Sequence, residues 1–410
     1  METILSLDFG SNSITAAVAK IEGSGLLELI TATNHECKKG IKNGVVTSIY
    51  SASNTIKRIL DEIESKNDDL KLDSAYIGVR GTHILSLNNR GIYTITRNDK
   101  EITESDVISV IENARAIHLQ NERIILHTIP QDFSVDKESG FSNPVGMEGN
   151  IIETEVHLIT ANISHLNNIA KAVANAGLNT KDTIYHAYPL AETVITEEEK
   201  NLGSVLVDIG DLTTSIVIYQ DGKIRFSKEL PIGSFLITND IAYAYHTSFD
   251  TAQHIKEVYG YALSSLIKED REFDITLIDR SMKKRITESN LCEYIKPRLE
   301  EIIIAIKEEI SNSGYDERIN SIILTGGGSM LKGMDKAFER VFKGKEVRYG
   351  SISDSFVKIS DKKYMSQKYT TAIALLCYPI FIKPQLENFM IDEDSTTFSQ
   401  IVKWFKNLFS

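Results

Sequence analysis

Two stretches of the chain, 200 positions apart, place an aspartate at the end of an apolar run. Asp8 follows residues 4–7 and Asp208 follows residues 205–207, and in each case a glycine comes two positions later. Small polar residues and a second apolar run complete both stretches. This order predicts a strand, a tight turn and a second strand, with a carboxylate and hydroxyl groups at the bend.

Such a turn is suited to phosphate binding, because it exposes backbone N–H groups and its small residues let an anion approach them. A carboxylate there can hold a hydrated Mg²⁺. Either turn alone is more simply a tight hairpin with a buried aspartate, whereas two facing turns predict a clamp for a polyphosphate. The predicted phosphate-binding residues are Asp8, Gly10, Ser11, Asn12, Asp208, Gly210, Asp211, Thr213 and Thr214, with Asp8 and Asp208 holding the metal through water.

A third candidate is a run of glycines between a predicted buried strand, residues 321–325, and a predicted helix, residues 334–342. Three glycines let the backbone lie flat against a ligand. In isolation such a run indicates a flexible loop. Its position after the two turns favours a ligand contact instead, made by Gly326, Gly327, Gly328, Ser329 and Met330.

Length and composition set the frame for these sites. A chain of 410 residues is long enough for two or more domains, and the repeated turn predicts two similar domains that face each other. The net charge of −12, without a sustained basic stripe, argues against a nucleic-acid partner. The three widely spaced cysteines indicate reduced thiols, and we expect no signal peptide or membrane span and a cytosolic body.

The remaining pattern predicts the elements that position the turns. Residues 86–156 form an α+β insert, in which Thr103 and Asp106 resemble the capping box of a helix at 107–118. Residues 189–199 are expected to form one helix. Residues 235–307 are expected to be largely helical, with Pro297 near the start of a long helix.

The last residues differ from the rest. Residues 384–397 are polar and acidic, which is typical of a tether, and the segment 398–410 repeats large apolar residues at helical spacing. Such a helix either packs on the core or lies in a membrane surface. The acidic tether and the terminal position favour the membrane. Its predicted membrane residues are Phe398, Ile401, Val402, Lys403, Trp404, Phe405, Lys406, Leu408 and Phe409.

The ordered trio of two phosphate turns and a late glycine loop resembles the actin/Hsp70/sugar-kinase superfamily. Within it the chain resembles the FtsA family of bacterial cell-division proteins over nearly all of its length. The similar segments are residues 40–46, 196–203, 230–233, 238–244 and 323–328. The resemblance implies an actin-like fold that binds ATP with Mg²⁺, with Gly233, Gln253 and Lys256 among the nucleotide contacts.

The same resemblance implies a division of the chain into subdomains. The expected parts are 1–85 with 157–198 (1A), 86–156 (1C), 199–228 with 300–383 (2A), 229–299 (2B), 384–397 (linker) and 398–410 (membrane helix). It also implies a filament on the cytoplasmic face of the cell membrane at the division septum. There it would tether FtsZ, the Z-ring protein, because Arg298 and Glu301 in 2B would bind the C-terminal peptide of FtsZ. Other division proteins would be recruited through 1C.

Three residues depart from the family pattern. Leu212 stands where a glycine is common in the second turn, and Gln253 replaces an acidic residue expected to contact the ribose. Tyr188 stands before Pro189, where relatives often have an acidic residue, and Glu192 is the nearest carboxylate to that position. Without a placed base, water activation loses ~10²–10⁴-fold. We therefore expect ATP binding with slow or absent hydrolysis, and no catalytic residue can be named.

Three other classes of protein share parts of this pattern. A metabolite kinase of the same superfamily needs a catalytic carboxylate that the sequence does not supply and has no use for a lipid-binding tail. An Hsp70-like chaperone needs a peptide-binding domain after the nucleotide body. Other membrane-attached actin homologues remain open alternatives: residues 86–156 argue against an MreB-like protein and less firmly against a pilus-assembly adaptor.

Overall fold

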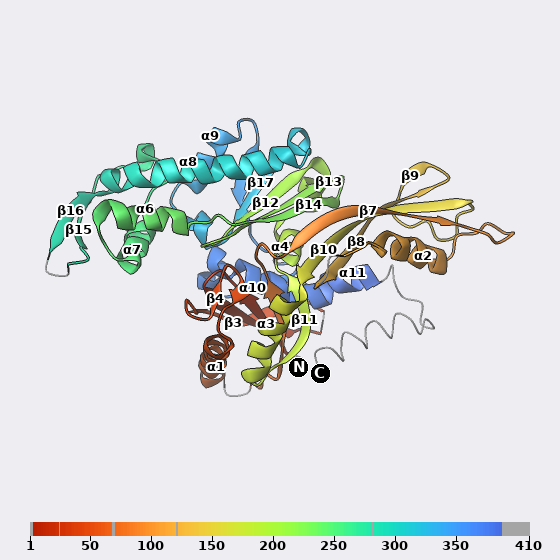
Figure 1. Cartoon of the computed structure of the whole chain (residues 1–410), viewed down its shortest axis with the longest axis horizontal. Helices are drawn as coiled ribbons and strands as arrows, with labels where there is room; N and C mark the ends of the chain where they lie inside the picture. Colours follow the sequence, from red (N-terminus) through yellow and green to blue (C-terminus); the bar gives the residue numbers. More distant parts are fainter. Residues whose placement is uncertain (1–2, 24, 68–69, 120–121, 280–281, 388–410) are drawn as a thin grey trace.

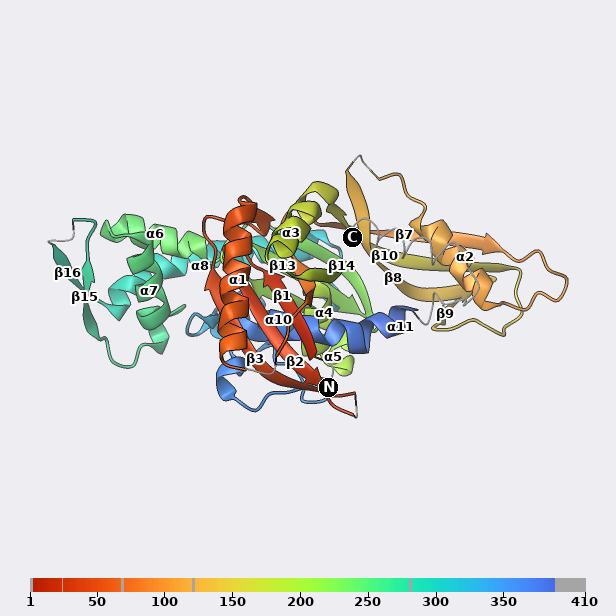
Figure 2. The same cartoon turned by 90° about the horizontal axis from the view of Figure 1, so that it is seen from below.

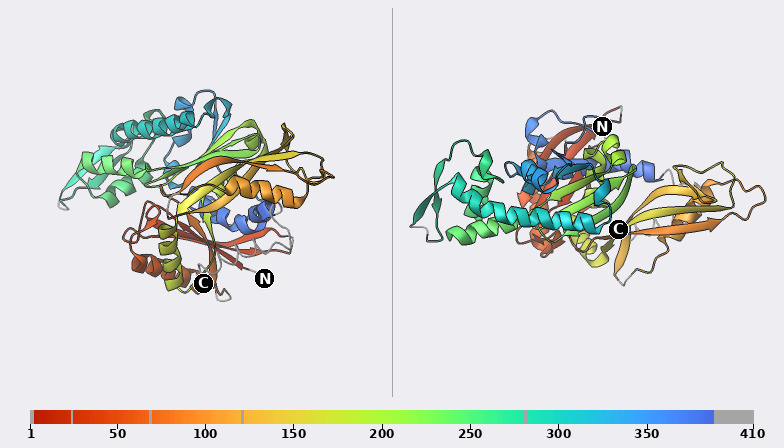
Figure 3. Two further views of the ribbon diagram at one scale, coloured as in Figure 1. Left: turned by 45° about the vertical axis from the view of Figure 1, so that its right-hand side comes forward. Right: turned by 90° about the horizontal axis from the view of Figure 1, so that it is seen from above.

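The computed structural model describes residues 3–23, 25–67, 70–119, 122–279 and 282–387. The predicted membrane residues and most of the predicted linker lie outside these ranges. Two sheets, one above the other in Figure 1, form the centre of an elongated molecule. An insert extends from one end and a helical unit from the other, as Figures 2 and 3 also show.

The first sheet has the order β11-β6-β1-β2-β3-β19. Its strands are β1 (Thr3–Phe9), β2 (Ser13–Ile21), β3 (Leu27–Glu36), β6 (Ser74–Val79), β11 (Asn179–Tyr185) and β19 (Val357–Lys358). Helices α1 (Ile49–Ser65), α3 (Ile163–Asn175) and α10 (Gln367–Cys377) pack on it, and a small ribbon of β4 (Ile41–Lys42) and β5 (Val45–Val46) lies nearby. The predicted first hairpin is confirmed as the antiparallel pair β1–β2.

The second sheet repeats this plan in the order β14-β13-β12-β17-β18. Its strands are β12 (Ser204–Ile209), β13 (Thr214–Gln220), β14 (Lys223–Leu230), β17 (Ser321–Thr325) and β18 (Glu346–Tyr349). Alternate residues of β12 divide its two faces: Val205 and Val207 pack with the helices of the second half, while Leu206 joins the core of the first half. The two halves therefore share a continuous apolar core around α4 (Ala187–Val194) and α10.

The end of the chain returns to the first sheet. Residues 300–383 were expected in 2A, but β19 pairs with β3, and Ser6 donates a hydrogen bond of 2.6 Å to the carbonyl of Ala372 in α10. The first residues of the expected linker are helical in α11 (Lys383–Glu387), where Lys383 pairs with Asp182 at 2.8 Å. Local sequence does not show that β19 and α10 return to the first sheet. Their position depends on which of the two sheets has an apolar face left to cover.

The insert is an antiparallel sheet of order β7-β10-β8-β9 with one helix on it. Its elements are β7 (Leu85–Thr94), α2 (Glu104–Arg115), β8 (Arg123–Val135), β9 (Glu138–Phe141) and β10 (Ile151–Asn162). The predicted capping box of Thr103 and Asp106 is confirmed. Strand β7 continues through Gly91 without a break, and Asn88 of β7 donates to the carbonyl of Arg225 in β14 at 2.9 Å.

The outer unit of the second half corrects two further predictions. It contains α6 (Phe235–Tyr245), α7 (Phe249–Tyr259), the hairpin β15 (Glu272–Thr276) and β16 (Lys283–Thr287), and α8 (Glu288–Asn312). Pro297 was expected near the start of the long helix, but Thr287 caps α8, and Pro297 lies inside it. The predicted helix 189–199 is two helices, α4 and α5 (Glu197–Leu202), because Thr196 and Glu199 form a capping box. Helix α9 (Met334–Val341) follows β17, as predicted.

Within the described ranges, no helix is long and apolar enough to cross a membrane.

Gly91 gives a test of how the insert is packed. A Cβ there would lie 2.1 Å from the carbonyl oxygen of Val110 and 2.7 Å from the amide of Ala114, both in α2. We expect Gly91→Ala to lower the free energy of unfolding by about 1–3 kcal/mol, because α2 must move away from β7. Urea denaturation measures this. In the control Gly23→Ala, a Cβ meets no atom within 4 Å, and equal effects of the two changes would contradict the packing.

Candidate functional site

The two predicted turns have the same geometry. The amide of Gly10 donates to the carbonyl of Ser13, and the amide of Gly210 donates to the carbonyl of Thr213, both at 2.9 Å. The flanking strands pair in the same register, Phe9 with Ile14 and Ile209 with Thr214. The internal repeat inferred from the sequence is therefore a structural repeat.

The turns contact each other across the boundary between the halves. Asn12 donates its side-chain amide to Asp211 at 2.7 Å, and the hydroxyl oxygens of Ser11 and Thr213 are 3.4 Å apart. The backbone amide of Leu212 donates to the Ser11 hydroxyl at 3.2 Å. Amide, hydroxyl and carboxylate groups of the two halves therefore meet at one place.

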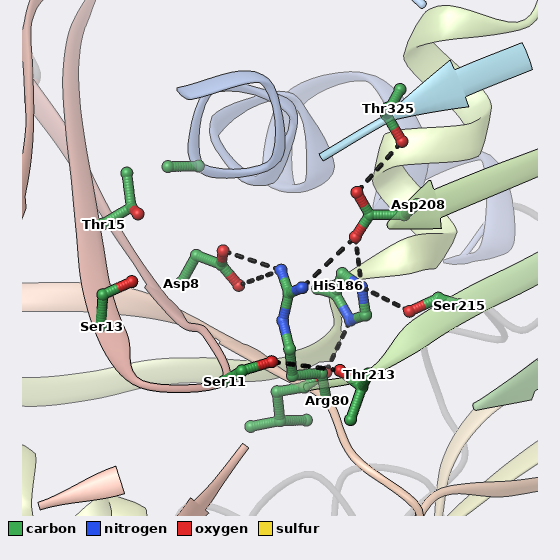
Figure 4. Close-up of polar contacts among 12 residues, drawn as sticks. Asp8, Ser11, Ser13, Thr15, Arg80, His186, Asp208, Thr213, Ser215 and Thr325 are labelled. Carbon is green, nitrogen blue, oxygen red and sulfur yellow. Dashed lines mark hydrogen bonds and ion pairs between the residues drawn. The ribbon is translucent and has the colours of Figure 1, made fainter. Parts of the chain in front are cut away.

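Arg80, which follows β6, lies between the two aspartates (Figure 4). Its Nη2 is 3.1 and 2.9 Å from the carboxylate oxygens of Asp8, and its Nη1 is 3.3 Å from Oδ2 of Asp208. The three side chains are 6%, 7% and 1% exposed, respectively. Burial by itself would lower the pKa of Arg80, but attraction to Asp8, Asp208 and Glu229 outweighs it and raises that pKa, so the guanidinium stays charged.

Asp208 has further partners. His186 Nε2 lies 3.2 Å from its Oδ2 and 3.0 Å from the Ser215 hydroxyl, and Thr325 donates to its Oδ1 at 3.1 Å. Burial alone would raise the pKa of Asp208, but the hydrogen bond from His186 and the charge of Arg80 together lower it. Asp208 is thus held ionised at the junction of β12, β17 and α4 (Figure 4).

The predicted metal role of Asp8 and Asp208 does not fit this geometry. Both oxygens of Asp8 accept from Arg80, and both oxygens of Asp208 have partners. Both oxygens of Asp8 and Oδ2 of Asp208 face the guanidinium, and Oδ1 of Asp208 faces Thr325. The described residues also contain no cluster of three or more His, Cys, Asp or Glu side chains suited to a metal ion.

The glycine loop lies directly against the second turn. Gly326 has φ of 85°, and a Cβ there would lie 2.4 Å from the carbonyl of Ile209 and 2.5 Å from Oδ1 of Asp208. A Cβ on Gly233 would likewise lie 2.4 Å from the carbonyl of Asp211, whereas one on Gly327 would meet no atom within 4 Å. Gly233 and Gly326 are thus required by close packing around the turn, and Gly327 presents open backbone.

The two residues after this loop, Ser329 and Met330, and the two predicted contacts on α7, Gln253 and Lys256, differ in burial and in their partners. Ser329 is buried and donates to the carbonyl of Gly326 at 2.7 Å, while Met330 is 53% exposed. Lys256 is buried and donates to the carbonyl of Ser234 at 3.2 Å, and burial lowers its pKa to about 8, against the attraction of Asp211. The carbonyl of Gln253 accepts from Thr238 at 2.6 Å, so this side chain is already engaged.

The shift of Lys256 has a definite sign. The folded chain binds this proton less tightly than the unfolded chain does, because burial opposes the ammonium. The resulting destabilisation is complete below about pH 8 and is progressively removed as the pH rises from there toward the unfolded value. An anion bound beside Lys256 would reverse this shift.

The position expected to carry a catalytic base has none. Tyr188 is 3% exposed, and burial raises its pKa well above the ordinary value. Glu192 accepts from the Tyr219 hydroxyl at 2.5 Å and from Lys200 at 2.6 Å, so its carboxylate is committed to these partners.

The predicted partner residues lie on α8 in the outer unit. Arg298 Nε donates to Asp240 at 2.6 Å, and its Nη1 donates to Glu301, also at 2.6 Å. Asp240 is on α6, so Arg298 joins two helices as well as presenting charge at the surface. The Glu301 side chain is 66% exposed.

Two residues of the site were missed by the sequence analysis. Arg80 stands at the end of a buried strand, and a charged residue there is a usable signal. His186 directly precedes α4, and nothing local distinguishes it from a structural histidine. The pairing of β6 with β1 brings Gly78 beside Asp8 and so places Arg80, and the pairing of β11 with β6 places His186.

Comparison with known families and solved structures supports the two-domain fold described above and identifies the families that share it. The profile of the family described as "Cell division protein FtsA" matches residues 205–374, and that of "SHS2 domain inserted in FTSA" matches residues 81–160. Solved structures of similar fold include the PilM-PilN type IV pilus biogenesis complex (TM-score 0.64, 16% identity, 92% of this chain and 98% of that one). Another is MreB5 of Spiroplasma citri bound to ADP (TM-score 0.52, 14% identity, 96% and 99%). The fold is therefore an actin-like α/β fold with an inserted SHS2 domain.

Full-length relatives are closer in sequence. The cell division protein FtsA of Pseudomonas aeruginosa is 34% identical over 376 residues, which cover 92% of this chain and 88% of the relative. FtsA of Escherichia coli strain K12 is 30% identical over 385 residues, covering 92% and 90%. The chain belongs to the FtsA family of actin-like cell division proteins.

Proposed function

We propose that this chain is a nucleotide-dependent adaptor, which binds ATP between its actin-like halves, forms filaments and tethers FtsZ to the membrane. The observation that carries the proposal is the pair of turns with the same backbone hydrogen bond that meet across the boundary between the halves. A ligand held by both turns stabilises one angle between the halves. A fixed angle is what a subunit needs in order to stack in a regular filament.

Two solved relatives support parts of this proposal at the level of the fold. The MreB5 protein of Spiroplasma citri was solved bound to ADP and to AMPPNP, and MamK was solved as a double helical filament (TM-score 0.51, 12% identity). In this chain the first turn supplies Ser11 and Asn12, the second supplies Thr213, and the open backbone at Gly327 faces the nucleoside.

Membrane attachment is proposed from the sequence of residues 398–410, where large apolar residues alternate with lysines at helical spacing. FtsZ binding is proposed for the outer unit, where Arg298 and Glu301 present charge on α8. Other division proteins are proposed to bind the insert. The place of action would be the cytoplasmic face of the cell membrane at the septum.

Lys256 tests the nucleotide site. We expect Lys256→Met to weaken ATP binding about tenfold, which is ~1.4 kcal/mol, because a buried ammonium near the second turn favours an anion. Calorimetric titration with ATP measures it. Lys343→Met, which removes an exposed lysine, is the control and is expected to bind as the wild type does. Equal affinity in all three proteins would exclude Lys256 from the site.

Hydrolysis is expected to be slow or absent, because Tyr188 is buried and Glu192 is held by Tyr219 and Lys200. Phosphate release should stay below about 1 s⁻¹, the low end of ordinary enzymes, and Glu192→Gln should leave this rate unchanged. A turnover comparable with a metabolic kinase, lost in Glu192→Gln, would show that Glu192 is a base.

The tethering role predicts that FtsZ co-sediments with anionic vesicles only when this chain and ATP are present. Removing residues 398–410 should abolish vesicle binding of both proteins, since the apolar face is lost. Vesicle binding that survives this truncation would refute the membrane role of the segment.

A second variant separates the two attachments. Reversing the exposed charge in Glu301→Lys is expected to weaken the capture of FtsZ while this chain still sediments with vesicles. FtsZ capture that is unaffected by Glu301→Lys would move its binding site away from α8.

A further inference from the structure

The site contains the guanidinium of Arg80, a positive charge that the sequence motifs did not predict. Arg80 is in contact with Asp8 of one half and Asp208 of the other, and all three side chains are buried. Two ionised carboxylates brought together out of water repel each other, so a cation between them stabilises the pair. In this chain a side chain supplies that cation.

The position of Arg80 is fixed by the backbone around it. Strand β6 pairs in parallel with β1, with Gly78 beside Asp8, and Arg80 follows two residues later. Gly44 has φ of 76°, and a Cβ there would lie 2.4 Å from the Arg80 carbonyl oxygen and 2.9 Å from its Cγ. The arginine stem is therefore packed closely against the loop that carries Gly44.

A divalent cation at the same carboxylates would have to lie beside this guanidinium. Like charges in a buried site repel strongly, and Asp8 already gives both of its oxygens to Arg80. Mg²⁺ would also require room for the waters that it keeps. The arrangement thus opposes the metal role that the resemblance implied.

We propose that Arg80 is the built-in cation of the phosphate site and takes the place of a divalent ion at Asp8 and Asp208. This inference rests on the proposed nucleotide binding for its ligand, a polyphosphate anion, but not for its effect on metals. The Nε of Arg80 is buried and has no hydrogen-bond acceptor within the described residues, so one donor of the guanidinium is left unpaired. The chain therefore binds ATP with little dependence on Mg²⁺.

The first test uses Mn²⁺ alone, followed by electron paramagnetic resonance, on the full chain without nucleotide. The wild type is expected to show no site at the carboxylates. Arg80→Gln, which keeps a hydrogen-bond donor and removes the charge, is expected to gain one site that binds Mn²⁺ at least about tenfold more tightly than the wild type does. Adding Asp8→Asn to Arg80→Gln should remove the gained site.

The second test compares ATP affinity in Mg²⁺ and in a chelator. The wild type is expected to change less than about threefold, and Arg80→Gln to lose about tenfold or more in the chelator. A wild-type affinity that falls tenfold in the chelator, or a wild-type Mn²⁺ site lost in Asp8→Asn, would overturn the inference. Absence of ATP binding in both conditions would contradict the proposed function, while the Mn²⁺ experiment would still decide the role of Arg80.

Folding of the variant provides a third measurement. If Arg80→Gln is unstable, Mg²⁺ is expected to raise its melting temperature, because the ion replaces the missing charge, and to leave the wild type unchanged. A variant that Mg²⁺ does not stabilise, together with a wild type that it does, would contradict the proposal.

Discussion

Two buried carboxylates that face each other from separate halves of the chain impose the main constraint on this structure. Each aspartate ends the first strand of its sheet, so their approach follows from the internal repeat itself. Two ionised carboxylates in this position repel each other unless a positive charge lies between them. Arg80 supplies it, and breaking such a buried pair by removing one partner typically costs about 3–5 kcal/mol. The boundary between the halves is therefore electrostatic at its centre and apolar around it.

The apolar part of this boundary joins the two halves into one hydrophobic core. Leu206 of β12 and Ile323 of β17 belong to the same core as Tyr188 of α4. Helix α10, near the end of the described chain, packs on β1 and β2. The chain thus returns from the second sheet to the first at α10, and this helix packs against the strands with which the chain begins.

Much of this arrangement was predictable from local sequence. Asp8 and Asp208 were placed correctly, because each apolar run and the glycine after it determine a hairpin without reference to distant residues. The capping box of Thr103 was found for the same reason. Arg80 was not, because its function depends on β6 lying next to β1, and strand order is a property of the whole sheet.

Local signals also misled in identifiable ways. Pro297 suggested a helix start, but the preceding turns of α8 are held by packing of Leu291 and Ile295, and the solvent side tolerates the proline. Gly91 lies inside β7, where glycine is disfavoured, but its missing side chain is what lets α2 approach the strand. In both cases tertiary contact outweighed a propensity of about 1–3 kcal/mol.

The seam between β7 and β14 has a mechanical consequence. Ser86 and Asn88 of the insert donate hydrogen bonds of 2.5 and 2.9 Å to carbonyls of β14, and His157 lies 2.9 Å from the Ser227 hydroxyl. The insert is covalently part of the first half, yet it grips the edge of the second sheet. A change in the angle between the two halves would therefore have to break or rearrange these hydrogen bonds. The insert, which extends far from the two sheets (Figure 2), is thus attached to both halves at its base.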